Sequence, residues 1–267
     1  MEKIKRYVRL YKVFIAQFFK SIVQSKVNFL VGLCGFFLTQ ITGIAFLYLV
    51  FEQIPVLEDW TLDQLIFIYG FAQIPRGIDH LLTDNIWLLA WRLIVNGKFD
   101  RYMVRPMNLY LQVIFEKLQP DALGELLVGM ILIVVSFTKG IVIVDALHII
   151  LFIVSVCAGS IIYTAIKLLF ASFAFWIKVS GPVLYTAYQL SDFAKYPSGI
   201  YEKGVRFIIT WLVPFAFVAY LPASYFLQPN VSVFATIGVE CILAVVFFGI
   251  AYTVFTIGTK VYESAGT

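Results

Sequence analysis

The chain has 267 residues, of which 61% are hydrophobic and 13% are charged, and its formal net charge is +4. Soluble domains are about 45–50% apolar and about 25% charged, and a chain of this length could not bury so much apolar surface in water. The composition therefore excludes a soluble globular protein and indicates a polytopic membrane protein. The three cysteines lie in apolar stretches without metal-ligand spacing, which favours small buried side chains over a disulfide framework.

Residues 1–27 form a basic and aromatic arm without the short apolar core of a cleavable signal peptide. Apolar and aromatic residues recur in it at helical spacing, with Lys and Arg between them. This pattern predicts an amphipathic helix in the inner membrane interface, where its basic face meets anionic membrane lipids. Contact with a partner protein is the alternative. The recurring residues are Tyr7, Leu10, Tyr11, Phe14, Ile15 and Phe18.

Six segments have the length and composition of membrane spans, which need about 20 mostly apolar residues. The second is the weakest, because Arg76, Asp79 and His80 crowd its second half. The fifth is interrupted by Pro214 and Pro222, which kink helices or free their backbone carbonyls. The predicted spans are residues 29–50, 62–82, 121–137, 141–166, 208–227 and 231–257.

The Lys and Arg residues of the connections predict the orientation. They are concentrated in residues 1–27, 83–120 and 177–207 and include Lys260, whereas the opposite side has only Lys139. Because basic loops stay in the cytoplasm, both termini are predicted to be cytoplasmic, which six spans allow. The fold class is therefore an all-α integral membrane protein with six transmembrane helices. Its predicted parts are the interfacial helix (1–27), the six-span domain (28–258) and a cytoplasmic tail (259–267).

No motif for nucleotide hydrolysis or other catalysis occurs in the sequence. The only Gly-Lys pair, Gly97-Lys98, lacks the upstream Gly and the following Ser or Thr of a phosphate-binding loop. Zinc-protease and serine-hydrolase motifs are absent as well. The histidines, His80 and His148, are predicted on opposite sides of the membrane and cannot share a metal. The chain is therefore predicted to be no enzyme, with no catalytic residue, metal site or cofactor of its own.

Glu125 and Glu240 lie within predicted spans and Lys167 lies at the inner end of the fourth, where a charge costs a few kcal/mol. Glu125 and Lys167 have similar depths in neighbouring antiparallel spans, which predicts an ion pair; a pathway role or snorkelling without pairing are the alternatives. Glu240 lies roughly 13 Å deep at 1.5 Å per residue, without a cation of matching depth. A structural role is expected for Glu240, by protonation, by a Tyr hydrogen bond or by pairing across a subunit interface. A role in binding substrate is its alternative.

Residues 85–108 form the most distinctive connection. Trp87 to Val95 predict a short helix with one apolar face, Gly97 supplies its C-terminal stop, and Pro106 fixes the backbone before the next span. A short helix parallel to the membrane, followed by a basic turn, is suited to docking on a soluble partner. A plain basic loop is the alternative.

This connection resembles that of the permease subunits of type-2 ABC transporters, in particular the bacterial six-span exporter class. In that class a G-x-x-D-x-x-L-x-R-P pattern follows the short helix, and residues 97–106 read G-K-F-D-R-Y-M-V-R-P, with Met103 in place of Leu. Residues 196–201 and 214–222 are also similar to family stretches. In this class the chain after the fifth span often folds back into the outer leaflet, so residues 221–230 either do so or form a kinked helix with an outer loop.

The resemblance implies the membrane half of an ATP-driven exporter in the bacterial cytoplasmic membrane. Two permease subunits, identical or homologous, would form the pathway, and two copies of a separate ATPase would bind ATP and Mg²⁺; no nucleic acid is implied. The alternatives are an exporter of lipid or glycan conjugates with the same fold, a membrane scaffold or sensor, and a secondary transporter. The implied ATPase-coupling residues are Trp87, Trp91, Arg92, Gly97, Asp100, Arg101, Arg105 and Pro106.

Overall fold

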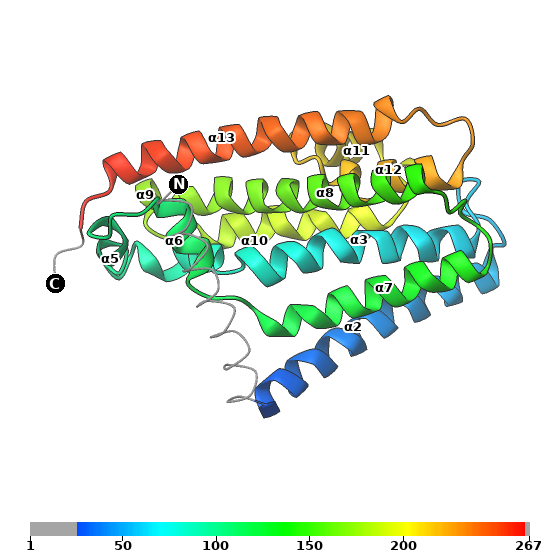
Figure 1. Ribbon diagram of the computed structural model, residues 1–267, viewed down its shortest axis with the longest axis horizontal. Coiled ribbons are helices and arrows are strands. Elements are labelled where there is room, and N and C mark those ends of the chain that lie inside the picture. Colours follow the sequence, from blue (N-terminus) through cyan, green and yellow to red (C-terminus); the bar gives the residue numbers. More distant parts are fainter. Residues whose placement is uncertain (1–25, 265–267) are drawn as a thin grey trace.

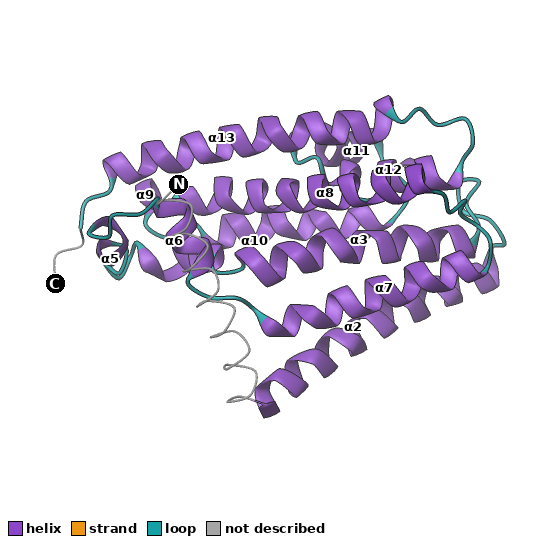
Figure 2. Ribbon diagram, viewed as in Figure 1, coloured by secondary structure: helices purple, strands orange, loops and turns teal. Residues whose placement is uncertain are grey.

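The computed structural model describes residues 26–264, so the predicted interfacial helix lies almost wholly outside the described residues. All regular elements within them are helices, which confirms the predicted all-α class (Figure 2). The longer helices are α2 (Lys26–Gln53), α3 (Leu62–Thr83), α7 (Leu123–Thr138), α8 (Ala146–Ser172), α10 (Gly181–Gln189) and α13 (Val239–Val261). The short α-helices are α4 (Ile86–Leu88), α5 (Asp100–Met103), α6 (Leu109–Phe115), α9 (Ala174–Ile177), α11 (Lys203–Phe207) and α12 (Tyr220–Leu227). The tighter 3₁₀ turns are η2 (Pro120–Ala122), η3 (Leu190–Lys195), η4 (Ser198–Ile200) and η6 (Phe215–Phe217), and the wider π turns are η1 (Leu89–Leu93), η5 (Ile208–Leu212) and η7 (Phe234–Gly238).

Four helices of the described part are long and apolar enough to cross a membrane, and they match the first, third, fourth and sixth predicted spans. A fifth candidate is a pair of helical segments bent by 69° at its break, which is either a broken span or a re-entrant loop. α3 has 22 residues but is less apolar, because its second half carries charges. The four helices are Phe29–Gln53, Pro120–Thr138, Ala146–Ile177 and Phe234–Val261, and the bent pair is Lys203–Leu212 with Phe215–Leu227.

The helices lie side by side in the order α2, α7, α3, α8, α13 (Figure 1). α3 and α7 approach closely because glycines meet between them: a Cβ on Gly129 would lie 3.0 Å from the Gly70 carbonyl oxygen. α8 begins later than the predicted span at residues 141–166. Its start is set by Asp145, whose side chain accepts a hydrogen bond from the His148 backbone N–H.

Residues 181–199 run from one end of the bundle to the other, antiparallel to α3. Gly181 lies against Trp91, just beyond the C-terminal end of α3, and Gly199 lies against Glu58, just before its N-terminal end. Figure 1 shows α10 extending along α8 within the bundle. The contacts in between keep the same order along both elements: Tyr188 with Asp79, Asp192 with Arg76, and Lys195 with Tyr69.

The predicted cytoplasmic loop at residues 177–207 is therefore wrong for most of its length. α10 and η3 carry too many polar side chains to stand out as an apolar span, although they follow the length of α3. α11, with Lys203 and Arg206, follows Gly199 and starts at the end of the bundle that holds the α2–α3 connection. That is the opposite end from the one predicted for these two basic residues.

Candidate functional site

A fully buried ion pair lies between α3 and α8. Lys167 Nζ is 2.7 Å from Asp79 Oδ2, and neither side chain has any exposed surface. Asp79 also accepts hydrogen bonds from Thr83, Thr164 and Tyr188. A buried ion pair is tolerated when the remaining lone pairs are satisfied, and these three hydroxyl groups satisfy those of Asp79.

A second group of charges joins α3, α7 and η3. Arg76 Nη1 lies 2.8 Å from Asp192 Oδ1, and Lys195 Nζ lies 2.8 Å from the same oxygen. On its other side Arg76 Nε is 3.7 Å from Glu125 Oε1, while His80 Nδ1 faces Glu125 Oε2 at 3.4 Å. Cations and carboxylates thus alternate across three elements, and each charge has an opposite neighbour.

The predicted Glu125–Lys167 ion pair is not formed. α3 lies between α7 and α8 and supplies a nearer partner to each: Arg76 and His80 face Glu125, and Asp79 pairs with Lys167. Arg76, Asp79 and His80, which weaken the second predicted span, all pair with neighbouring residues. Asp79 is completely buried, and Arg76 pairs with residues of two neighbouring elements.

Glu240, on α13, is completely buried against α8. Its Oε2 accepts a hydrogen bond from Ser155 Oγ at 2.5 Å, so a serine takes the position for which a tyrosine was considered. Its Oε1 has no hydrogen-bond partner in the described part of the chain. Gly159 leaves room for this oxygen, since a Cβ there would lie 3.3 Å from it. The structural role of Glu240 stays a prediction.

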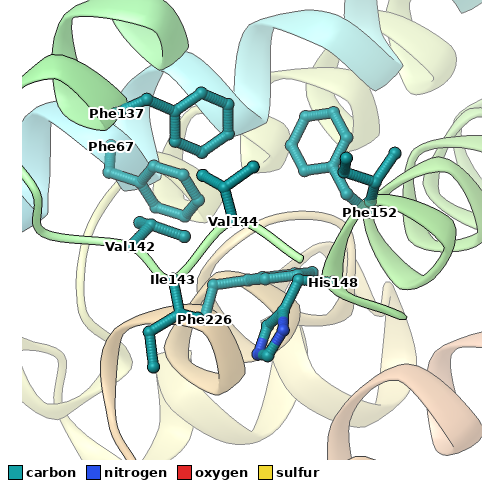
Figure 3. A pocket seen from close by; sticks show the side chains of 9 residues that line it. Phe67, Phe137, Val142, Ile143, Val144, His148, Phe152 and Phe226 are labelled. Carbon is teal, nitrogen blue, oxygen red and sulfur yellow. The ribbon is translucent and has the colours of Figure 1, made fainter. Parts of the chain in front are cut away.

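An apolar pocket of about 130 Å³ lies beneath the α7–α8 connection (Figure 3). His148 is the one titratable side chain in its lining; its Nδ1 is 2.8 Å from Asp145 Oδ1, and its ring stacks on Tyr225. Hydrogen bonds from the His148 backbone and ring lower the pKa of Asp145. The pocket suits a small apolar group rather than catalysis. Its lining residues are Phe67, Phe137, Val142, Ile143, Val144, His148, Ile149, Phe152 and Phe226.

A larger cavity of about 320 Å³ is lined by residues of α3, α6, α8 and α13. Its polar lining includes Asp79, Ser160 and Thr164, but Asp79 is already satisfied by its own partners. Among residues 26–264, no group of three or more His, Cys, Asp or Glu side chains could hold a metal ion.

The predicted coupling segment begins with a helix, at the end of the bundle where α3 ends. α4 and η1 cover residues 86–93, and Gly97 has a φ of 63°, a conformation that glycine adopts readily after a helix. The next helix, α5, carries Asp100 and Arg101. Of the residues expected to couple, Trp91, Arg92, Arg101, Arg105 and Pro106 are exposed, whereas Trp87, Gly97 and Asp100 are half-buried.

This segment holds α10 at two points. A Cβ on Gly181 would lie only 2.1 Å from the Trp91 ring, so the ring rests directly on the first turn of α10. Two turns further on, Trp87 packs edge-on against Tyr188, with ring centroids 5.5 Å apart. Tyr188 also donates to Asp79, which links the exposed segment to the buried charges.

Sequence reasoning assigned no site role to the polar residues of α10 and η3. Tyr185, Gln189, Asp192 and Lys195 lie in the stretch that was interpreted as a loop. Their spacing of three to four residues is a helical signal that could have placed them on one face.

A model of the ABC-2 family transporter proteins matches residues 37–266, so the chain belongs to this family of ABC transporter permeases. No curated protein and no solved structure matches it. Together with the apolar helices, family membership makes the chain a multi-pass membrane component of a transporter. Membership also implies an ABC ATPase as its general partner, in accordance with the missing phosphate-binding loop.

Proposed function

We propose that this chain lines the translocation pathway of an ATP-driven exporter as one of two permease subunits. A separate ATPase, present in two copies, binds ATP and Mg²⁺ and drives the transport cycle. The complex works in the bacterial cytoplasmic membrane. The family match supports the transport role, and the arrangement of the helices supports the topology and the coupling.

The proposed topology has six crossings: α2, α3, α7, α8, residues 181–199 and α13. The bent pair Lys203–Leu212 and Phe215–Leu227 then lies between the fifth and sixth crossings as a re-entrant element. An even number of crossings places both termini on one side. The fifth crossing thus differs from the predicted span at residues 208–227.

The distribution of charge supports cytoplasmic termini for this topology. More basic residues lie at the end of the bundle where α3 stops than at the opposite end, as expected for the cytoplasmic side. Those of the cytoplasmic end are Lys26, Arg92, Lys98, Arg101, Arg105, Lys117, Lys178 and Lys260, and those of the far end are Lys139, Lys203 and Arg206.

Cysteine labelling in right-side-out vesicles tests the topology. After the three native cysteines are replaced, Lys203→Cys is expected to react with a membrane-impermeant maleimide from outside. Lys98→Cys serves as the matched control and is expected to react only in opened vesicles. Labelling of both positions from the same side would refute six crossings with this fifth segment.

The attachment of the coupling segment to α10 is the observation that carries the proposal. The exposed Trp91 ring rests on Gly181, and the Ser180 backbone N–H donates to the Ala90 carbonyl at 3.0 Å. Ser180 Oγ donates in turn to the Ala171 carbonyl near the end of α8. A displacement of the exposed segment by an ATPase therefore moves α10, because the contact leaves no free space to absorb it.

Co-expression of this chain with its genomic neighbours, followed by purification, is the first test, and absence of any co-purifying ATPase would refute the proposal. Gly181→Ala then tests coupling, because its methyl group displaces Trp91. The assembled complex is expected to lose the ATPase stimulation that the wild-type permease confers. Gly204→Ala is the control, since a Cβ there meets no atom within 4 Å. Unchanged stimulation in Gly181→Ala would contradict coupling through this contact.

A further inference from the structure

One face of α10 and η3 is polar and exposed, although both elements run within the bundle. Tyr185, Gln189 and Asp192 follow one another on it at helical spacing, whereas Leu184 and Ala187 of the opposite face are buried. Gln189 Nε2 donates to Tyr185 Oη at 2.8 Å, which fixes the two side chains relative to one another. We call Tyr185, Gln189 and Asp192 the acceptor face.

The acceptor face lies at mid-depth. Gln189 is near the midpoint between Gly181 and Gly199, which contact residues at opposite ends of α3. An amide or a carboxylate is strongly disfavoured against lipid at this depth, and such groups in membrane proteins face a water-filled cavity or another subunit. The acceptor face therefore fits the wall of the pathway rather than the lipid surface.

Two oxygens on this face are open to hydrogen bonds from a cargo. Asp192 holds Arg76 and Lys195 through Oδ1 alone, and its side chain is 49% exposed, against 19% and 12% for the two cations. The cations therefore lie deeper than the carboxylate. Neither Asp192 Oδ2 nor Gln189 Oε1 accepts a hydrogen bond from any residue that the structure describes. A cargo in the pathway thus meets these two oxygens and the Tyr185 side chain, which is 55% exposed.

Charge decides which donor fits these acceptors. An anionic group would be repelled by the outermost carboxylate and attracted by Arg76 and Lys195 behind it, and it has no hydrogen to donate to Asp192 Oδ2 or Gln189 Oε1. A cationic group on Asp192 Oδ2 would be attracted by Asp192 and more weakly by Glu125, which lies beyond Arg76, and repelled by Arg76 and Lys195 close behind Asp192. Because Coulomb energy falls only with the first power of distance, the two repulsions nearly cancel the attraction. A neutral group with several hydroxyl donors forms hydrogen bonds to these oxygens without such opposing Coulomb interactions.

We propose that the acceptor face binds the neutral, hydroxyl-rich head group of an amphiphilic cargo, such as a glycosyl or polyol group. Hydroxyls donate to Asp192 Oδ2 and Gln189 Oε1, and the Tyr185 ring packs on the carbon face of the head group. This inference rests on the proposed transport function and names the cargo class for it.

Three amphiphiles with the same octyl chain test the head group: octyl glucoside, octyltrimethylammonium and octyl sulfate. The permease–ATPase complex is reconstituted in vesicles, and ATP hydrolysis is measured against the concentration of each compound below micelle formation. Octyl glucoside is expected to stimulate hydrolysis at the lowest concentration. Gln189→Leu is expected to raise the half-maximal concentration about tenfold, the effect of one lost hydrogen bond. Gln53→Leu, at the exposed end of α2, is the matched control and is expected to leave it unchanged.

Asp192→Asn provides an independent test. It removes the outermost negative charge and leaves Arg76 and Lys195 facing the pathway, so octyl sulfate is expected to become a stimulator. Stronger stimulation of the wild-type complex by octyltrimethylammonium or octyl sulfate than by octyl glucoside would overturn the proposal. So would a complex that hydrolyses ATP but does not respond to octyl glucoside, or equal responses of Gln189→Leu and Gln53→Leu. Failure to assemble with an ATPase would instead contradict the proposed function.

Discussion

Lys167→Met isolates the contribution of the buried ion pair to stability. The substitution keeps the length of the side chain but leaves the Asp79 carboxylate without its cation at zero exposure. At 2.7 Å and an effective dielectric constant of about 20, the lost attraction is about 6 kcal/mol. Thr83, Thr164 and Tyr188 still donate to Asp79 and recover part of it. The expected net cost is therefore about 3–5 kcal/mol, as for other broken buried pairs.

Thermal unfolding of the purified protein in detergent, followed by tryptophan fluorescence, measures this cost. A loss of about 3–5 kcal/mol corresponds to a fall in the unfolding midpoint on the order of 10 °C. The control is Lys139→Met, which breaks an ion pair with Asp63 whose side chains are both 44% exposed. Its expected cost is below about 1 kcal/mol.

The double variant Asp79→Leu, Lys167→Met tests whether the stability loss in Lys167→Met comes from the uncompensated charge of Asp79. Removing both charges is expected to restore most of the stability, since Asp84, the other carboxylate near Lys167, is 19% exposed and keeps His80 as a partner. A double variant as unstable as the sum of its two single variants would refute this reasoning, and the residues would then act by packing alone.

Three further outcomes follow from the structure. Gly129→Leu is expected to cost about 1–3 kcal/mol by overpacking between α3 and α7, and a fall in the unfolding midpoint measures it. Asp145→Ala is expected to remove a loss of stability that the wild-type protein shows at acid pH. Because hydrogen bonds from His148 lower the pKa of Asp145, the stabilising contribution of Asp145 persists above about pH 4 and disappears as the pH falls. Unfolding midpoints between pH 3 and 6 measure this difference. Glu240→Gln is expected to change the free energy of unfolding by no more than about 1 kcal/mol, because the amide oxygen still accepts a hydrogen bond from Ser155. The unfolding midpoint measures this change.

The parts of the fold that the sequence predicts correctly are those with a signal inside a single segment. Four spans follow from long apolar runs, because each residue of such a run favours the membrane by itself. The helix after the second span follows from its apolar face; it ends at Leu93, and Gly97, with its positive φ, lies in the turn that follows. Both patterns can be read within one segment and need no knowledge of its neighbours.

The ion pairs depend on neighbours and could not be predicted in the same way. Matching depth made Glu125 and Lys167 plausible partners, but depth does not say which helix lies between two others. α3 occupies that place, and its Asp79 and Arg76 satisfy both residues. Pairing in a bundle is set by the lateral order of the helices, which the depth of a residue leaves undetermined.

The proposed fifth crossing is not detected by hydropathy, for the same reason that makes it a candidate pathway element. A span that lines a polar pathway must carry groups that an apolar run excludes, so its hydropathy falls toward that of a loop. α3 shows the same conflict, and it is the element that residues 181–199 follow along its length. Two weakly apolar segments in one membrane protein each have polar groups that lipid cannot satisfy, and pairing them lets Arg76 meet Asp192 and Asp79 meet Tyr188. The weakest predicted span therefore lies beside another polar segment, and the stretch from residue 181 to residue 199 supplies the complementary groups Tyr188 and Asp192.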